Sequence, residues 1–263
     1  MDVSAKAVVL EVLSAGESIV DGTLPVRALV QAASVFDIAE NSVRVAIVRL
    51  RAEGLLESPR RGVYRLGPGA QMVNEKIHGW RTVSSRLGEW DGSWAAVFTA
   101  DLSRTDRPAL RRRQRALRYL GFEQLKTGLF LRPNNLKPGI DGLRAELRGL
   151  GLDSKASVFR MEDLDPEQDA RARVLWDGRS LEQTYSRLHG DLKVSMDRLE
   201  DLPIEDSVRE AFLLGREGIR HIVLDPLLPA PMVDTHKRST MVHLLQSYCD
   251  KGLHLWARFL AID

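Results

Sequence analysis

The segment from Asp37 to Leu66 constrains the fold most, because it encodes a short amphipathic helix followed directly by a basic hairpin. One face of the helix carries apolar residues at helical spacing, namely Val43, Ala46, Ile47 and Leu50. Such a face has to be buried against other helices, so the segment requires neighbours earlier or later in the chain.

Local signals set the expected ends of these elements. Asn41 or Ser42 is the expected N-cap of the helix, and Gly54 has the place of the glycine that ends it. Residues 55–57 and 63–66 alternate as two strands around the turn sequence SPRRG. Two further helices are expected before it, over residues 5–13 and from about residue 25 to residue 33.

This order of helices and hairpin is typical of a winged helix-turn-helix, in which one helix enters the major groove of DNA and the hairpin lies along the phosphates. The expected contacts to bases or adjacent phosphates come from Asn41, Ser42, Arg44, Val45 and Arg49. The expected phosphate contacts of the hairpin come from Arg60, Arg61 and Arg65. The alternatives are a solvated helix face and a charged turn that keeps the hairpin hydrated.

The charge distribution agrees with a confined DNA-binding surface. The formal net charge of the 263 residues is only +2. Residues 44–65 nevertheless contain six Arg against two Glu, and residues 104–118 contain seven Arg against one Asp. Residues 153–210 are acidic, with fifteen acids against nine bases. A small net charge therefore does not exclude nucleic acid as a partner.

The middle of the chain predicts a second domain. We expect strands over 94–100, 122–125, 129–132 and 157–161, and helices over 107–120 and 141–150, the latter with Asp141 as N-cap. The order βαββαβ is that of the ferredoxin-like fold. It assigns residues 1–69 to the winged helix, 70–89 to a linker helix and 90–165 to the ferredoxin-like domain.

Residues 166–263 are predicted to be all α-helical. The expected helices cover 166–175, 181–199, 204–224 and 235–260, and the sequence DPLLP at 225–229 interrupts them. Long helices with short connections favour a bundle that serves for dimerisation or for binding an effector. The fold class is therefore α+β.

Two groups of residues are candidates for binding an effector. Arg111 and Arg115 belong to an arginine cluster that could hold phosphates of a coenzyme A ligand, make a second DNA contact, or remain a solvated face paired with acids of the last third. Trp176, Tyr185 and Trp256 could line an aromatic pocket, although such residues more often belong to the core.

Other chemistries find little support. The single cysteine excludes an intramolecular disulfide and a cysteine metal cluster, and no apolar run approaches membrane-spanning length. Asp101 follows the first strand of the middle domain but has no second carboxylate beside it to hold a metal for nuclease activity. We expect a cytoplasmic protein that is not an enzyme, with no cofactor, no metal and no membrane contact.

Four stretches together resemble the PaaX family, the repressors of phenylacetic-acid degradation genes. They are IAENSVRVAIVRLRAEGLL at 38–56, DGSW at 91–94, ALRYLGF with GLFLRPNN at 116–135, and AFLL with DPLLP at 211–229. The resemblance covers nearly the whole chain. After DPLLP the sequence APMVDTHKR departs from the Trp-Pro-Gly-like stretch expected of the family.

The resemblance implies a homodimeric transcriptional repressor. It implies binding to a palindromic operator in double-stranded DNA and release by an aryl-CoA thioester such as phenylacetyl-CoA. The alternatives are a DNA-binding regulator without a ligand and a metal-dependent nuclease that acts through the middle domain.

Overall fold

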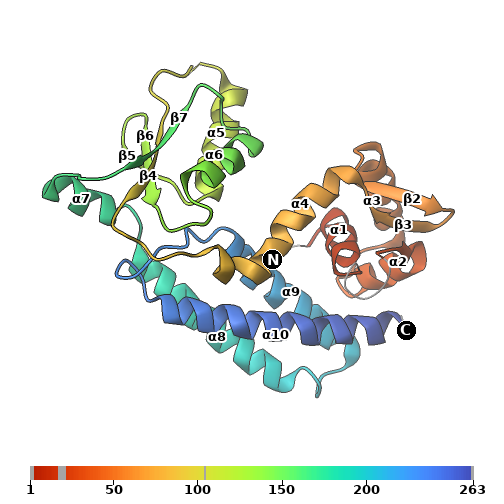
Figure 1. Cartoon of the computed structure of the whole chain (residues 1–263). Helices are drawn as coiled ribbons and strands as arrows, with labels where there is room; N and C mark the ends of the chain where they lie inside the picture. The colour runs from red at the N-terminus through yellow and green to blue at the C-terminus, as the bar shows by residue number, and fades with distance from the viewer. Residues whose placement is uncertain (1–2, 17–21, 104, 262–263) are drawn as a thin grey trace. The chain divides into compact units, whose positions relative to one another are not determined.

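The computed structural model describes residues 3–16, 22–103 and 105–261 (Figure 1). The chain forms two packing units, each built from separate stretches of sequence. The first combines Met1–Trp80, Gly190–Ile219 and His243–Asp263, and the second combines Arg81–His189 and Arg220–Val242. The domain boundaries predicted from the sequence stay a prediction.

The first unit begins with three helices and a small antiparallel sheet. The helices are α1 (Ala5–Gly16), α2 (Val26–Ser34) and α3 (Glu40–Ala52), and the strands are β1 (Leu24–Pro25), β2 (Leu56–Arg60) and β3 (Val63–Leu66). The strand order is β1-β3-β2, so the predicted hairpin gains a third strand from before α2. Val43, Ile47 and Leu50 of α3 are buried, as their spacing predicted.

The end of α3 was predicted correctly and its beginning was not. Gly54 adopts φ +70°, the left-handed conformation that ends a helix at little cost. The N-cap is Ala39, however, and not Asn41 or Ser42. Ala39 is extended and its carbonyl accepts the Ser42 amide at 2.9 Å, while Glu40 places a negative charge at the positive end of the helix.

The second unit contains a four-stranded antiparallel sheet in the order β5-β6-β4-β7. Its strands are β4 (Trp94–Phe98), β5 (Glu123–Lys126), β6 (Leu129–Pro133) and β7 (Ser157–Met161), and its helices are α5 (Arg107–Tyr119) and α6 (Ile140–Gly149). The predicted order βαββαβ is confirmed, but the predicted N-cap Asp141 is wrong. Gly139 caps α6 instead, at φ +89°, and Asp141 lies in the first turn.

Helices α5 and α6 lie on one side of this sheet and α7 (Pro166–Arg173) lies on the other (Figure 1). Ala172 of α7 packs on Trp94, Ala96, Leu129 and Leu131. Asp165 caps α7 by accepting the Gln168 amide at 2.9 Å. A connecting helix α4 (Pro68–His78) and a 3₁₀ segment η1 (Gly79–Arg86) precede the sheet, where a linker helix was predicted.

The last third is helical, as predicted, with α8 (Gly178–Arg198), α9 (Ile204–Val223) and α10 (Thr235–Leu260). Each of these helices contributes residues to both packing units. In the first unit, Ser195 of α8 bonds Tyr248 of α10 at 2.7 Å and donates to Glu210 of α9. Arg198 also binds Glu210, at 2.8 Å, so a polar cluster holds the three helices together.

The first three helices dock directly on α9 and α10 within the first unit. The rings of Phe36 and Phe212 are 4.8 Å apart, and Arg209 binds Asp37 at 2.9 Å. The side-chain amide of Gln31 donates to the carbonyl of Phe259 at 2.8 Å. The turn before α3 is therefore fixed by residues some 170 positions later in the chain.

Candidate nucleic-acid interface

The exposed face of α3 combines an apolar centre with charged flanks. Val45 and Val48 are 41% and 66% exposed, and their spacing of three residues places them next to each other on the helix surface. On a helix, Asn41, Val45, Val48 and Ala52 fall on one line opposite the buried residues. A flat apolar strip between polar groups suits the thymine methyl and the polar base edges of the major groove.

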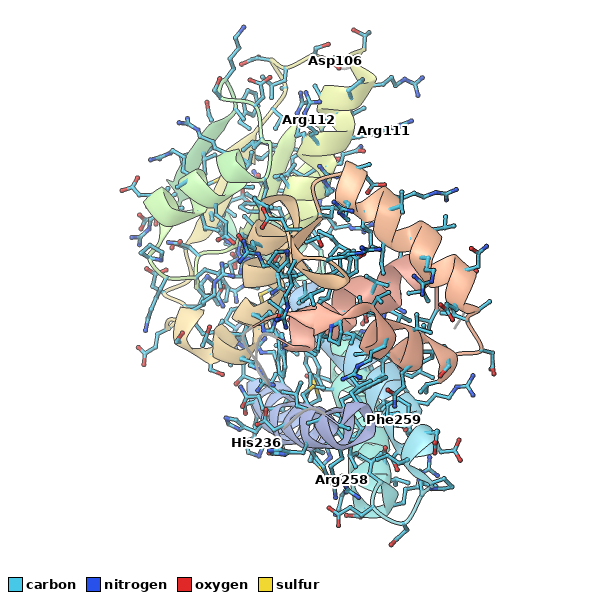
Figure 2. The ribbon with its side chains drawn as sticks, turned by 90° about the vertical axis from the view of Figure 1, so that its right-hand side faces the viewer. Asp106, Arg111, Arg112, His236, Arg258 and Phe259 are labelled. Atoms are coloured by element: carbon cyan, nitrogen blue, oxygen red, sulfur yellow. The ribbon has the colours of Figure 1, made fainter. Side chains whose placement is uncertain are left out.

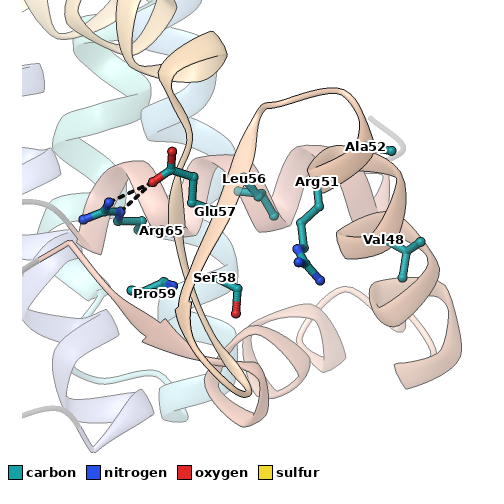
Figure 3. A pocket seen from close by; sticks show the side chains of 8 residues that line it. All are labelled: Val48, Arg51, Ala52, Leu56, Glu57, Ser58, Pro59 and Arg65. Carbon is teal, nitrogen blue, oxygen red and sulfur yellow. Dashed lines mark hydrogen bonds and ion pairs between the residues drawn. The ribbon is translucent and has the colours of Figure 1, made fainter.

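A groove separates the second half of α3 from the hairpin (Figure 3). Its volume is about 720 Å³, and its lining comprises Val48, Arg51, Ala52, Leu56, Glu57, Ser58, Pro59 and Arg65. Arg51 enters it from α3 and Arg65 comes from β3. It belongs wholly to the first packing unit.

The hairpin tip presents two arginines to solvent. Arg60 pairs with Val63, and Arg61 and Gly62 form the turn, with Gly62 at φ +76°. The Ser58 hydroxyl donates to the Arg60 carbonyl at 2.8 Å, and the Gly62 carbonyl accepts the Val26 amide at 2.8 Å. The first bond lies within the hairpin and the second ties the tip to the start of α2, and the Arg60 and Arg61 side chains stay exposed.

Ion pairs divide the cations of this surface into two groups. The first group is paired: Arg44 binds Glu40 at 2.6 Å and Arg65 binds Glu57 at 2.8 Å. The third acid of this surface, Glu53, forms an ion pair with Lys6 of α1 at 2.7 Å. Within the described part of the chain, four cations of α3 and the hairpin make no ion pair, namely Arg49, Arg51, Arg60 and Arg61. Because all three neighbouring acids are occupied, the surface keeps a local positive charge.

All eight predicted DNA-contact residues are exposed, on α3 or on the hairpin. They are Asn41, Ser42, Arg44, Val45, Arg49, Arg60, Arg61 and Arg65. Val48, which like Val45 can contact a thymine methyl, and Arg51 are exposed on the same surface. Their exposure follows from the same helical spacing, so the pattern of apolar burial was sufficient to find them.

The five candidate effector residues are divided between the two packing units. Arg111 and Arg115 are exposed on α5, and the Trp176 ring stacks on Trp94 at 6.1 Å. Tyr185 is buried and donates to Asp225. Trp256 lies in the first packing unit, against Phe212 and Phe259, whereas the other four lie in the second.

Sequence patterns missed a buried polar cluster in the second unit. Arg132 of β6 is 1% exposed and donates to the carbonyls of Leu120 and Pro226 and to the amide oxygen of Asn135. Burial lowers the pKa of the Arg132 guanidinium to about 9, so it remains charged at neutral pH. Asn135 in turn donates to the Leu227 carbonyl at 2.8 Å.

The same cluster continues through the segment 225–229. Arg238 donates to the Leu228 carbonyl at 2.8 Å and lies 3.9 Å from Asp225. Burial raises the pKa of the Asp225 carboxyl, while the Arg238 charge acts in the opposite direction. The stretches ALRYLGF, GLFLRPNN and DPLLP thus meet in one place.

Neither a metal centre nor a membrane span is found among the described residues. No group of three His, Cys, Asp or Glu side chains lies close enough together there to hold a metal ion. Asp101 is exposed in the turn that follows β4. No helix in that part of the chain has the length and apolarity to cross a membrane.

These elements define a mixed α/β protein in which a basic three-helix and hairpin unit precedes an antiparallel βαββαβ sheet and a helical last third. A family model described as PaaX-like protein matches residues 4–68. A second, described as PaaX protein central Cas2-like domain, matches residues 87–173. The chain belongs to the PaaX family, which is a family of transcriptional regulators.

One solved structure supports the fold over the whole length. The uncharacterized protein Rv0674 from Mycobacterium tuberculosis superposes with a TM-score of 0.66 over 98% of this chain and 97% of its own, at 20% sequence identity. A likeness at that identity concerns the fold alone. A search of curated proteins returned no match to this chain.

Proposed function

We propose that this protein is a homodimeric transcriptional repressor that binds a palindromic DNA operator. The first three helices and the hairpin act as a winged helix-turn-helix, with α3 as the recognition helix and β2–β3 as the wing. The observation that carries this proposal is the exposed face of α3, where apolar Val45 and Val48 lie among arginines. Four cations of α3 and the hairpin make no ion pair with any described residue. The βαββαβ unit is a ferredoxin-like domain.

The proposed mechanism is a shift of population caused by an aryl-CoA thioester such as phenylacetyl-CoA. One α3 reads only a few base pairs, so two copies at a fixed half-site spacing supply the specificity. A ligand that prefers a dimer with a different spacing releases the operator. As a regulator of genes, the protein acts in the cytoplasm, is not an enzyme and requires no cofactor.

The test begins with selection of duplexes from a random pool by the full chain. Arg44→Ala is then compared with Arg171→Ala, a control on α7 with a similar helical ion pair to an acid four residues before it. We expect Arg44→Ala to weaken binding by about 1–3 kcal/mol, roughly 5- to 160-fold, with the loss concentrated at particular bases of the half-site. Equal affinities of the two variants for every selected duplex would refute the assignment of α3.

The dimer and the ligand are tested on the same material. Light scattering coupled to gel filtration should give twice the chain mass, and footprinting should protect two symmetric half-sites. Phenylacetyl-CoA should weaken binding to the selected duplex, whereas free coenzyme A should not. Operator affinity that ignores every acyl-CoA would favour a regulator without a ligand.

A further inference from the structure

Helix α5 carries a stripe of arginines that the proposed recognition surface does not use. Arg107, Arg111, Arg115 and Arg118 are spaced by four, four and three residues, so they share one face of the helix. All four are exposed, and the opposite face buries Ala116 and Leu117. We call these four residues the α5 stripe. Figure 2 shows Arg111 and its neighbour Arg112 close to the start of α5 at Asp106.

The stripe has no acidic partners in the described residues. Residues 107–119 contain no Asp or Glu, and the nearby Asp106 is engaged as N-cap, accepting the Ala109 amide at 3.0 Å. None of the four arginines makes an ion pair with a described residue. The alternative in which acids of the last third neutralise this cluster therefore lacks support within this packing unit.

In other helices of the same unit, arginines form ion pairs with acids of the same helix. Arg144 binds Asp141 three residues earlier, and Arg173 binds Asp169 four residues earlier at 2.6 Å. In α5 the same spacings place arginine against arginine, which is unfavourable for an isolated helix. Arg107 adds a positive charge at the positive end of the helix dipole. A helix that accepts these repulsions has a surplus charge available for an anionic partner.

The shape of the stripe favours a polymer over a small ligand. Its length from Arg107 to Arg118 is about 17 Å at the rise of an α-helix. It runs along the convex surface of a helix, whereas sites for small molecules are concave. Double-stranded DNA presents a phosphate charge for about every 1.7 Å of axis, and guanidinium groups bind phosphates bidentately.

We propose that the α5 stripe is a second, sequence-independent contact for the phosphate backbone of DNA outside the segment read by α3. This inference rests on the proposed function, because it assumes that the chain binds DNA at all. It adds the prediction that the second packing unit contributes to affinity without contributing to base recognition.

The test compares two triple variants of the full chain with equal charge change. The stripe variant is Arg107→Gln/Arg111→Gln/Arg115→Gln, and the control is Arg171→Gln/Arg179→Gln/Arg220→Gln, three exposed arginines of the same packing unit. Each binds a duplex trimmed to the selected site and one extended by about two helical turns (~20 bp) on each side. Circular dichroism first verifies that both variants melt like the wild type.

We expect the wild type and the control to bind the extended duplex more tightly and with a steeper salt dependence than the trimmed one. The stripe variant should lose this difference, with the slope of log K against log salt falling by about 2.7 per protomer for three phosphates. Its preference among bases of the selected site should be unchanged.

Three results would contradict the inference or its premise, and they can be told apart. A stripe variant with the slope and affinity of the control on the extended duplex refutes the second DNA contact and leaves the recognition surface intact. If coenzyme A raises the melting temperature of the wild type and of the control but not of the stripe variant, with DNA binding unchanged, the stripe is instead a phosphate site for a small ligand. A wild type that binds neither duplex refutes the proposed function itself.

Discussion

Gly121→Ala is expected to destabilise the second packing unit far more than a glycine substitution with similar backbone geometry. Gly121 follows α5 at φ +70°, and an added Cβ would lie 2.6 Å from Cα of Pro226. That neighbour is backbone, so the segment around Pro226 has to move. The same segment supplies the carbonyls that accept from Arg132, Asn135 and Arg238.

A matched control separates backbone strain from displacement of the segment around Pro226, the two contributions to the loss of unfolding free energy. Gly92 has φ +87°, and a Cβ added there would meet nothing within 4 Å, so Gly92→Ala measures the left-handed strain alone, about 1 kcal/mol. Gly121→Ala adds the loss of partners for buried donors, each worth about 1–3 kcal/mol. A total near 4 kcal/mol follows if most of those bonds are broken.

Urea unfolding followed by tryptophan fluorescence is the appropriate assay. Trp176 donates to the Gly121 carbonyl at 3.1 Å and stacks on Trp94, so its emission reports the region that moves. We expect the unfolding free energy of Gly121→Ala to lie about 3 kcal/mol below that of Gly92→Ala. Equal losses for the two variants would show that the 225–229 segment yields freely and that the polar cluster does not hold it.

Three further predictions concern the first packing unit. Burial raises the pKa of Glu11 to about 6, against the opposing charge of Arg216, so the folded state binds this proton more tightly than the unfolded chain and loses stability as pH rises from about 4.5 to about 6. The expected loss of unfolding free energy is about 1 kcal/mol, after allowance for the partial exposure of the Glu11 side chain. Urea unfolding at pH 4.5 and at pH 7 should show this loss in the wild type and not in Glu11→Gln. Val48→Ala should weaken operator binding by about 1 kcal/mol, roughly fivefold, and the effect should vanish on a duplex with uracil in place of thymine; an equal effect on both duplexes would exclude a methyl contact. Phe212→Ala should lower the free energy of unfolding by about 2 kcal/mol and should speed amide hydrogen exchange in the turn at Phe36. Unchanged exchange there would show that the contact between the two rings does not hold the turn.

Local sequence signals predicted most helices and strands to within a few residues. The recognition segment could be predicted because its apolar face, its terminating glycine and its hairpin turn are contiguous between Asp37 and Leu66. Side-chain chemistry alone misplaced two N-caps. Ala39 and Gly139 offer no capping side chain, and their extended or left-handed backbones start the helices instead.

Features that depend on distant residues were not predictable in this way. The two-residue strand β1 exists because Leu24 pairs with Tyr64, and nothing near Leu24 indicates that partner. Arg132 interrupts an apolar strand and would ordinarily mark an exposed position. It is buried because the carbonyl of Pro226, 94 residues later, accepts a hydrogen bond from its guanidinium.

The docking of the first helices on α9 also changes what regulation would require. Phe36 and Asp37 immediately precede α3 and contact Phe212 and Arg209 of α9, so α3 is fixed to that helix and not merely tethered by the chain. A ligand can alter the placement of α3 only by as much as it prefers one packing of α9 over another. The ion pair between Arg209 and Asp37 joins exposed groups and contributes little, about 0–1 kcal/mol. The contact between Phe36 and Phe212 therefore has to supply most of the free-energy difference between two packings of α9. A search for effector control should therefore follow the packing of Phe36 on α9 before it follows any contact at the DNA surface.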